Sequence, residues 1–137
     1  MAEAVIFGNG DFAQHYPAFN ELRRDGDFID VHLRSGELKI PAHRLILASR
    51  IPYFRQLVDG RLPADHDFEL ILDEVSPSIL EAFVEYAYTG QMAISLDNLL
   101  ETLRAAIFLD VATVRDFCRQ VIESQELKEM NTMRTRW

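Results

Sequence analysis

Histidine and cysteine are the residue types in this sequence best suited to bind a metal or act as nucleophiles. The histidines are four: His15, His32, His43 and His66. They lie far apart and none has a metal-ligand spacing such as His-x-x-x-His, so we expect ordinary surface or core histidines and no metal site. The single cysteine, Cys118, falls within the apolar pattern of a helix, which favours a buried core residue over a thiol nucleophile.

Carboxylates and glycines provide no reactive group either. Asp73 and Glu74 are neighbours in the sequence, so their side chains point in different directions. The segment Gly8-Asn9-Gly10 lacks a preceding long strand and the Gly-Lys-Ser/Thr that completes a phosphate-binding loop. Because no reactive groups converge, the sequence predicts a protein that is not an enzyme and uses no cofactor.

Two charged residues occupy positions where a charge is costly unless it is paired. Asp30 lies in an otherwise apolar strand pattern, and Arg44 opens a short helix. One interpretation is a solvated aspartate on the open face of the strand. The other is an ion pair at the rim of a pocket, and the residues alone leave both open.

The composition describes one globular domain. The chain has 137 residues, of which 48% are hydrophobic, and a net charge of −8. No basic stripe precedes the C-terminal end, so we expect no direct binding to nucleic acid. We also expect no membrane helix and no secretory signal. A single cysteine cannot form an internal disulfide, which indicates a reducing compartment, cytoplasmic or nuclear.

The first half of the chain is predicted to be rich in strands. We divide the sequence into an N-terminal arm (1–10) with a short β-prone run, a domain (11–125) and a tail (126–137). The tail is either a frayed end or the start of a following segment. A helix within 11–24 starts or kinks near Pro17. Residues 29–33 and 38–40 alternate as a β-hairpin, and two short helices (42–49 and from Pro52) and a third strand (68–72) follow.

The second half is predicted to be mainly helical. Ser76-Pro77 starts a helix that ends at Gly90. Ile94 fits one more short strand. We expect Ser95 or Asp97 to cap the next helix and Asp110 to cap the last one. An order with most helices after the strands predicts an α+β fold.

Three collinear segments resemble BTB/POZ domains of the kelch-like type. They are Phe19-Asn20-Glu21-Leu22-Arg23-x-x-Gly26-x-Phe28-x-Asp30-Val31-x-Leu33, Ala42-His43-Arg44-x-Ile46-Leu47-Ala48-Ser49-x-x-Pro52-Tyr53-Phe54 and Phe83-x-x-Tyr86-x-Tyr88-Thr89-Gly90. With matches in the last helices, the resemblance covers about residues 12 to 123. It implies the BTB/POZ fold: a small three-stranded sheet flanked by a cluster of helices, in a two-fold homodimer.

The resemblance also implies how the dimer forms. Family members dimerise through the N-terminal helix, whose apolar residues here are Phe12, Tyr16, Phe19 and Leu22. In a lone domain these would be an exposed apolar patch, which usually marks an interface. The alternative is a helix that folds back on its own core. The resemblance further implies that Val5-Ile6-Phe7 is a strand exchanged with the partner, and that Asp30 and Arg44 form the family's charged pocket.

Many kelch-like members bind cullin three and act as substrate adaptors of a ubiquitin ligase. The resemblance places the cullin-facing surface at Tyr53, Phe54 and the loop that follows, where Leu62 is the hydrophobic anchor and Ala64 replaces the family's usual Glu. We therefore predict a homodimeric interaction domain that is the cullin three-binding part of such an adaptor, its substrate held by a domain outside this chain. The alternative is a dimerisation or corepressor-recruiting module, as in BTB zinc-finger transcription regulators.

Overall fold

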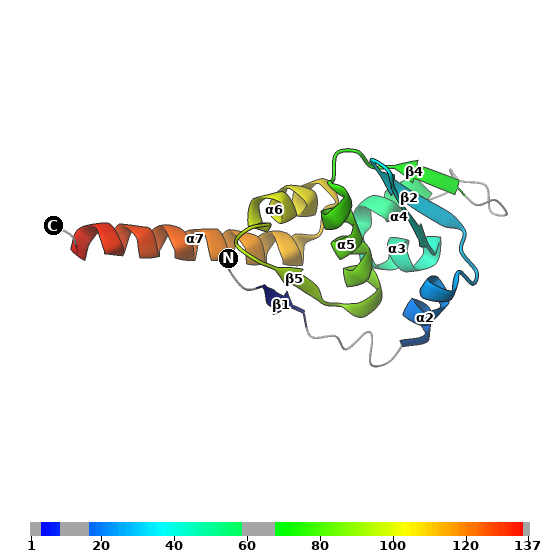
Figure 1. Ribbon diagram of the computed structural model, residues 1–137, viewed down its shortest axis with the longest axis horizontal. Helices are drawn as coiled ribbons and strands as arrows, with labels where there is room; N and C mark the ends of the chain where they lie inside the picture. Colours follow the sequence, from blue (N-terminus) through cyan, green and yellow to red (C-terminus); the bar gives the residue numbers. More distant parts are fainter. Residues whose placement is uncertain (1–3, 9–16, 59–67, 136–137) are drawn as a thin grey trace.

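The computed structural model describes residues 4–8, 17–58 and 68–135. In chain order the elements are β1 (Val5–Phe7), α2 (Pro17–Asp25), β2 (Val31–Ser35), β3 (Leu38–Ala42), α3 (Arg44–Arg50), α4 (Pro52–Val58), β4 (Phe68–Ile71), α5 (Pro77–Thr89), β5 (Met92–Ile94), α6 (Leu99–Phe108) and α7 (Ala112–Thr135). The sheet and most of the helices pack around a shared core (Figure 1). The predicted α+β class and the order of the elements are confirmed.

The three-stranded sheet has the strand order β3-β2-β4. β2 pairs antiparallel with β3, with Leu33 opposite Ile40, which confirms the predicted hairpin. β4 joins the other side of β2 in parallel, with Leu33 opposite Leu70. β2 begins at Val31, two residues later than predicted, and β3 continues through Pro41. An edge strand such as β3 tolerates a proline, because one side of it has no ladder to complete.

β1 forms a separate two-stranded ribbon with β5 of the same chain. The pairing is antiparallel, with Val5 opposite Ile94 and Phe7 opposite Met92. The expected exchange of this strand with a partner stays a prediction, since the structure describes one chain, in which β1 pairs with β5 of the same chain. A sequence pattern identifies a strand but not the chain with which it pairs, because the backbone hydrogen bonds are the same in either case.

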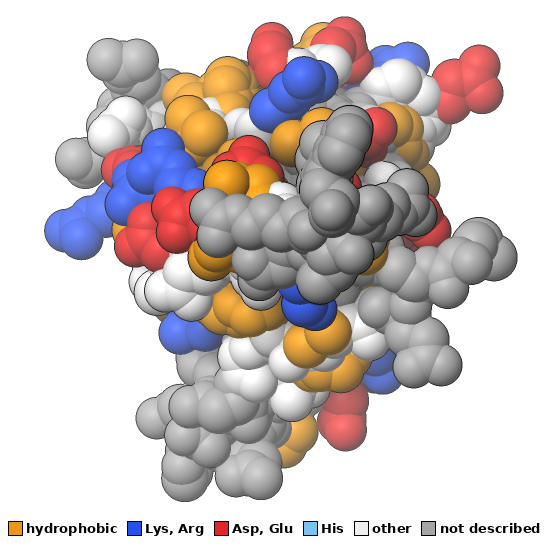
Figure 2. Space-filling model, turned by 90° about the vertical axis from the view of Figure 1, so that its left-hand side faces the viewer, with side chains coloured by type: hydrophobic (Ala, Val, Ile, Leu, Met, Phe, Trp, Pro, Cys, Tyr) orange, Lys and Arg blue, Asp and Glu red, His pale blue; other side chains and the backbone are white. Residues whose placement is uncertain are grey.

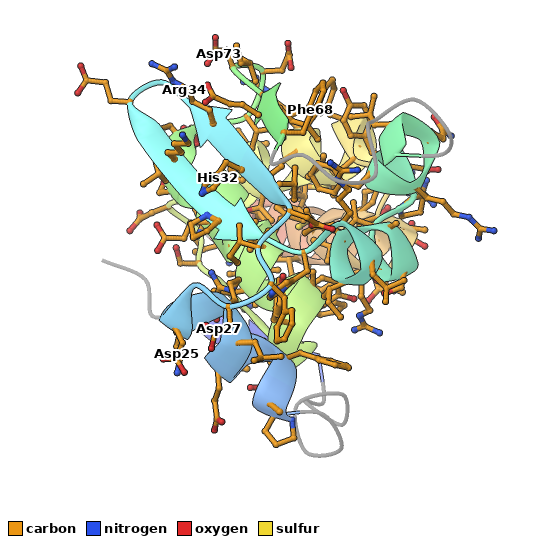
Figure 3. All side chains as sticks on the ribbon, turned by 90° about the vertical axis from the view of Figure 1, so that its right-hand side faces the viewer. Asp25, Asp27, His32, Arg34, Phe68 and Asp73 are labelled. Carbon is orange, nitrogen blue, oxygen red and sulfur yellow. The ribbon has the colours of Figure 1, made fainter. Side chains whose placement is uncertain are left out.

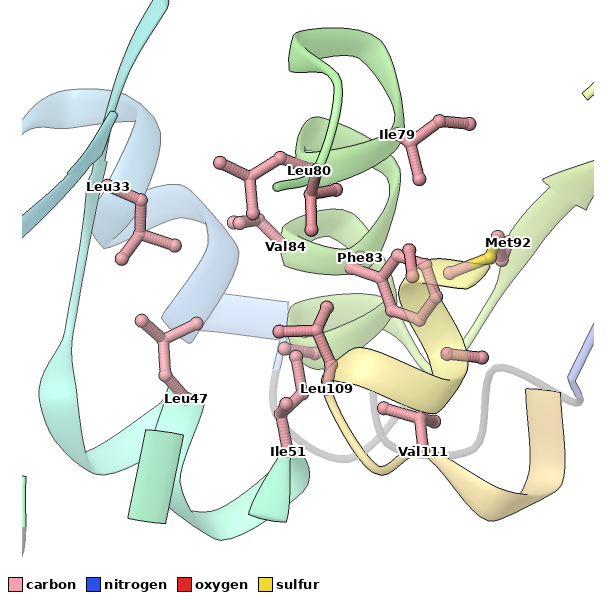
Figure 4. Close-up of a cluster of buried hydrophobic side chains, with 14 of the residues drawn as sticks. Leu33, Leu47, Ile51, Ile79, Leu80, Phe83, Val84, Met92, Leu109 and Val111 are labelled. Atoms are coloured by element: carbon pink, nitrogen blue, oxygen red, sulfur yellow. The ribbon is translucent and has the colours of Figure 1, made fainter. Parts of the chain in front are cut away.

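α5 is central to the core (Figure 4). Its buried side chains recur at the helical period: Ile79, Leu80, Phe83, Val84, Ala87 and Tyr88. They belong to one buried cluster with Leu33 of β2 and Leu47 of α3. Ser76 precedes the helix in an extended conformation, Pro77 lies in its first turn, and Gly90 ends it with a φ of 76°, as predicted.

α6 and α7 begin at residues other than those predicted. The residue before α6 is Asn98, whose side-chain oxygen accepts the backbone N–H of Ser95 at 2.9 Å, so neither Ser95 nor Asp97 is the cap. Asp110 has a φ of 59° in the turn between the two helices and lies too early to cap α7. α7 continues unbroken across residue 126, where a separate tail was predicted, and projects from the rest of the molecule (Figure 1).

Candidate interaction surface

An apolar groove lies between α2 and the start of α3, at the end of the molecule that Figure 3 faces. Its hollow has a volume of about 240 Å³. Phe28 and Leu45 lie at this groove and are 82% and 78% exposed. Its lining residues are Phe19, Leu22, Phe28, Asp30, His43, Leu45 and Ile46. Large apolar side chains exposed around a hollow are typical of a surface that binds another protein.

Phe28 has an unfavourable backbone conformation. Its φ of 60° lies in the left-handed region, which bulky residues rarely adopt. The ring gains little burial in return, since most of it is exposed. Strain that the fold itself does not repay is typical of positions that serve an interaction.

α2 contributes two of the four residues predicted for the dimer interface. Phe19 and Leu22 line the groove, and both are half-buried. Phe19 also packs against the core, so α2 covers part of its own apolar side. Phe12 and Tyr16, the other two predicted residues, lie outside the described part of the chain.

A buried arginine fixes the position of α2. Arg23 Nη2 donates to Oδ1 of Asn20 on the same helix at 2.9 Å and to Oε1 of Glu85 on α5 at 2.5 Å. The guanidinium carbon also lies 4.8 Å from the ring centroid of Tyr88, a cation–π distance. A buried charge is tolerable when it is paired in this way, and here the pairing joins α2 to the central helix.

His43 and Tyr88 hold the loop that carries Phe28. The Tyr88 hydroxyl accepts the backbone N–H of His43 at 2.8 Å and lies 2.7 Å from Nδ1 of the same residue. His43 Nε2 lies 2.8 Å from the carbonyl oxygen of Asp27. Because a carbonyl only accepts, we assign the proton of a neutral imidazole to Nε2, and the hydroxyl then donates to Nδ1. Burial raises the pKa of Tyr88 to about 12, so the hydroxyl keeps its proton.

The predicted charged pair, Asp30 and Arg44, is brought together at the groove. The backbone N–H of Arg44 donates to Oδ1 of Asp30 at 2.7 Å, and Nε of Arg44 donates to the backbone carbonyl of Asp30 at 3.0 Å. His43, the residue before α3, makes no side-chain cap, so the Asp30 carboxylate satisfies a free N–H in the first turn. Asp30 also lines the groove, which favours the pocket-rim interpretation over a solvated aspartate.

The two aromatic residues of α4 that were predicted to face cullin differ in burial. Phe54 is fully buried, with 0% exposure, so its assignment as a contact residue is corrected. Tyr53 is half-buried, and its ring centroid lies 4.8 Å from that of Phe108 on α6. Burial, assisted by the negative charge of Glu74, raises the pKa of Tyr53. Leu62, the third predicted residue, lies outside the described residues.

Phe28, Leu45 and Phe108 were not predicted to be site residues. A signal for Phe28 existed, because an aromatic residue directly after a Gly-Asp turn has few ways to reach a core. Leu45 gave no such signal. α3 has seven residues, too few for the helical period to separate its exposed from its buried positions.

Within the described ranges, no group of three or more His, Cys, Asp or Glu side chains is placed to hold a metal ion. No helix in the same ranges is long and apolar enough to cross a membrane. Cys118 is buried, and burial raises the pKa of its thiol, which keeps it in the less nucleophilic form. On the face that carries α7, basic side chains lie among acidic ones (Figure 2).

The family model of the BTB/POZ domain matches residues 19–126. The chain belongs to the BTB/POZ family. BTB/POZ domains are non-enzymatic interaction modules, as the lack of convergent reactive residues in the sequence predicted.

The relatives of this BTB/POZ domain include kelch-like proteins. Kelch-like protein 28 of Mus musculus is 39% identical over 106 residues, which are 77% of this chain and 19% of that protein. Kelch-like protein 38 of Rattus norvegicus is 31% identical over 126 residues, 91% of this chain and 22% of that protein. The chain therefore spans about a fifth of the length of these relatives. Among solved structures, the BTB domain of zebrafish PATZ1 has a TM-score of 0.70 and 31% identity, and the match covers 82% of this chain and 91% of that one.

Proposed function

We propose that this BTB/POZ domain forms a two-fold homodimer through the groove between α2 and α3. The observation that carries the proposal is the pair of exposed side chains, Phe28 and Leu45, beside an apolar hollow. A two-fold contact uses the same patch on both copies, so each protomer can offer its exposed apolar side chains and accept those of the other. Phe19 and Leu22 supply the half-buried floor of this surface.

Substitution at the groove tests the dimer. Leu45→Glu places two charges in a two-fold interface, one from each copy, and removes an apolar contact worth about 1.5–3 kcal/mol per side chain. Leu100→Glu is the matched control, because Leu100 is also exposed but lies on α6, away from the groove. Light scattering coupled to size exclusion should find monomers for Leu45→Glu and dimers for Leu100→Glu. Dimers of both variants would assign the interface elsewhere.

We further propose that the dimer is the cullin three-binding part of a ubiquitin ligase adaptor, with a substrate-binding domain outside this chain. The kelch-like relatives support this role. So does the aromatic contact of Tyr53 with Phe108, which gives α4 and α6 one continuous, partly exposed surface.

Calorimetry with the N-terminal region of cullin three tests the ligase role. We expect binding that weakens in Tyr53→Ala and tightens in Ala64→Glu, which restores the family's usual residue. Wild-type protein that shows no binding at tens of micromolar would exclude this role and leave the dimer untouched.

A second candidate function is a dimerisation or corepressor-recruiting module of a transcription regulator. The likeness to the BTB domain of PATZ1, at 31% identity over most of both chains, favours it. The two functions differ in the cullin experiment: a stable dimer without cullin affinity supports the second.

A further inference from the structure

α6 has a second apolar side, which points away from the core. The helix packs against α5 and α7. The buried residues of this inner side are Leu99, Thr102, Ala105 and Ala106. On the outer side, Leu100 and Ile107 are 61% and 53% exposed. A helix at the surface of a domain normally presents polar residues to solvent, and a helix that is apolar on all sides is normally buried. The outer side of α6 therefore has the composition of a contact surface.

The apolar residues of this outer side have the spacing of a coiled coil. Leu100, Leu103 and Ile107 follow one another at intervals of three and four residues, and Leu96 precedes Leu100 by four. Leu96 lies in the turn before α6 and is 48% exposed, and Leu103 is half-buried. Alternating intervals of three and four place side chains on one side of a helix, where a second helix can pack. We call these four residues the α6 stripe.

The α6 stripe is complementary to itself in one register. In an antiparallel pair of α6 helices related by a two-fold axis, Leu100 lies opposite Leu103 of the second copy. Leu96 then lies opposite Ile107 of the second copy. The two-fold axis repeats both layers, so all four side chains of each copy meet an apolar side chain of the other.

The charges beside the stripe favour the same register. Asp97 and Arg104 are exposed, and their separation of seven residues places them along the same side of the stripe. In the antiparallel pair each Asp97 lies opposite Arg104 of the other copy, which gives two contacts between opposite charges. A parallel pair would instead bring these charges to the other side of the partner's stripe, where Leu99 and Ala106 are buried in the domain. The flanking charges therefore favour an antiparallel contact between identical helices.

The position of α6 leaves the stripe accessible. In Figure 1, α6 lies on the far side of α5 from α2, away from the groove between α2 and α3. The contact is also small. Four apolar side chains from each copy bury less than the roughly 1,200 Å² of a standard interface, which is typical of weak association. We therefore expect a dissociation constant on the order of 100 μM.

We propose that the α6 stripe is a second self-association surface, at which two copies of this chain pair through antiparallel α6 helices. The occupant of the stripe is the stripe of another copy. The contact does not use the groove between α2 and α3 or the ring contact of Tyr53 with Phe108, so it is independent of the proposed dimer and of the cullin role. Where the groove also pairs two copies, each dimer carries two stripes and can assemble further.

Sedimentation equilibrium of the full chain over a wide concentration range tests this surface. The average mass of the wild-type protein should rise by roughly half or more between about 10 μM and about 1 mM. Leu100→Glu should abolish the rise and leave the species at low concentration unchanged. Leu127→Glu is the matched control, because Leu127 is 59% exposed but lies on α7, and this variant should retain the rise. A wild-type mass that stays constant would overturn the proposal and assign the stripe to another protein or to a different segment.

Charge exchange tests whether the occupant is a second copy in the antiparallel register. Asp97→Arg and Arg104→Asp each turn two contacts between opposite charges into two between like charges. Each variant alone should therefore associate roughly tenfold more weakly than wild type. An equimolar mixture of the two variants should regain association, because each then meets the opposite charge at both contacts. The proposal is overturned if the mixture associates no better than either variant alone, or if Leu100→Glu keeps the concentration-dependent rise in mass.

Discussion

At the scale of single residues, the position of the groove depends on hydrogen bonds among a few polar groups. The Tyr88 hydroxyl accepts a hydrogen bond from the backbone N–H of His43 and is also hydrogen-bonded to the imidazole of that residue. The imidazole is in turn hydrogen-bonded to the backbone carbonyl of Asp27. This chain of three hydrogen bonds runs from the central helix to the turn before Phe28. Loss of the hydroxyl therefore affects both stability and the position of the groove.

Tyr88→Phe should lower the free energy of unfolding by about 1–3 kcal/mol, because it leaves the His43 N–H without its partner. Urea denaturation measures the change. Tyr86→Phe removes a hydroxyl whose hydrogen bond to Thr113 is exposed, and it should change stability by less than about 0.5 kcal/mol. Equal effects of the two substitutions would contradict the role assigned to the buried network.

Alkaline pH should weaken the fold through the same hydroxyl. The pKa of Tyr88 is raised from 10.0 to about 12 in the folded protein, so folding favours the protonated phenol. Its contribution is fully present below pH 10 and is lost as the pH rises to about 12, a change of about 2–3 kcal/mol. The stability difference between wild type and Tyr88→Phe should narrow by that amount between pH 9 and 12. A constant difference across this range would refute the assignment.

The substitution Phe28→Asn should raise the stability of the isolated domain and weaken its self-association. Asparagine tolerates the left-handed conformation, so the isolated domain should gain about 1 kcal/mol when measured at concentrations where it is monomeric. The same change removes an exposed ring from the groove and should weaken self-association. Leu45→Asn, in regular helix, should weaken association without the gain in stability. A Phe28→Asn domain that dimerises as well as wild type would show that the strained ring has no role in binding.

At the scale of elements, α2 is the least extensively anchored helix of the groove. It has nine residues, and its buried members are Asn20 and Arg23. Both are polar, so α2 is held by the hydrogen bonds and cation–π contact of Arg23 with α5 as much as by apolar packing. A helix held by a few polar contacts opens more readily than one buried in the core.

Arg23→Met should release α2 while the rest of the fold persists. It keeps the apolar length of the side chain and removes the three hydrogen bonds of the guanidinium to Asn20 and Glu85, together with the charge opposite Glu85. Amide hydrogen exchange should then accelerate in residues 17–25 by tenfold or more, with exchange in α5 unchanged as an internal control. Uniform acceleration in both helices would mean that Arg23 supports the whole fold instead of one element.

Some of the elements could be predicted from the sequence, and others could not. α5 was predicted with both ends, because thirteen residues repeat the helical period and Ser76-Pro77 and Gly90 bound it. The contact residues of short elements were harder to predict. In the seven residues of α4, Tyr53 and Phe54 are adjacent aromatics, and the family resemblance assigned both to one contact surface, although Phe54 is buried. The prediction of the α6 cap was wrong, because the residue before the helix is Asn98, whose side chain accepts the backbone N–H of Ser95. The pairing of β1 with β5 of the same chain depends on tertiary structure, and no local sequence pattern predicts it.

At the scale of the whole molecule, the fold presents surfaces of different kinds. The groove between α2 and α3 is apolar and strained at its edge, which suits a second copy. The β1–β5 ribbon lies against α7, where the ring centroid of Phe7 is 4.7 Å from that of Phe117. The family resemblance singled out Leu22 and Asp30, which line this groove, whereas Phe28 and Leu45 emerged only when the loop and α3 were placed together in space.

Sedimentation equilibrium of the wild-type domain tests the central claim, that the groove between α2 and α3 is covered by a second copy. We predict a single species of twice the chain mass of 15.8 kDa at micromolar concentration. The matched experiment on Leu45→Glu should return 15.8 kDa. A folded wild-type domain that sediments at the mass of one chain at the highest concentration reached would contradict the account.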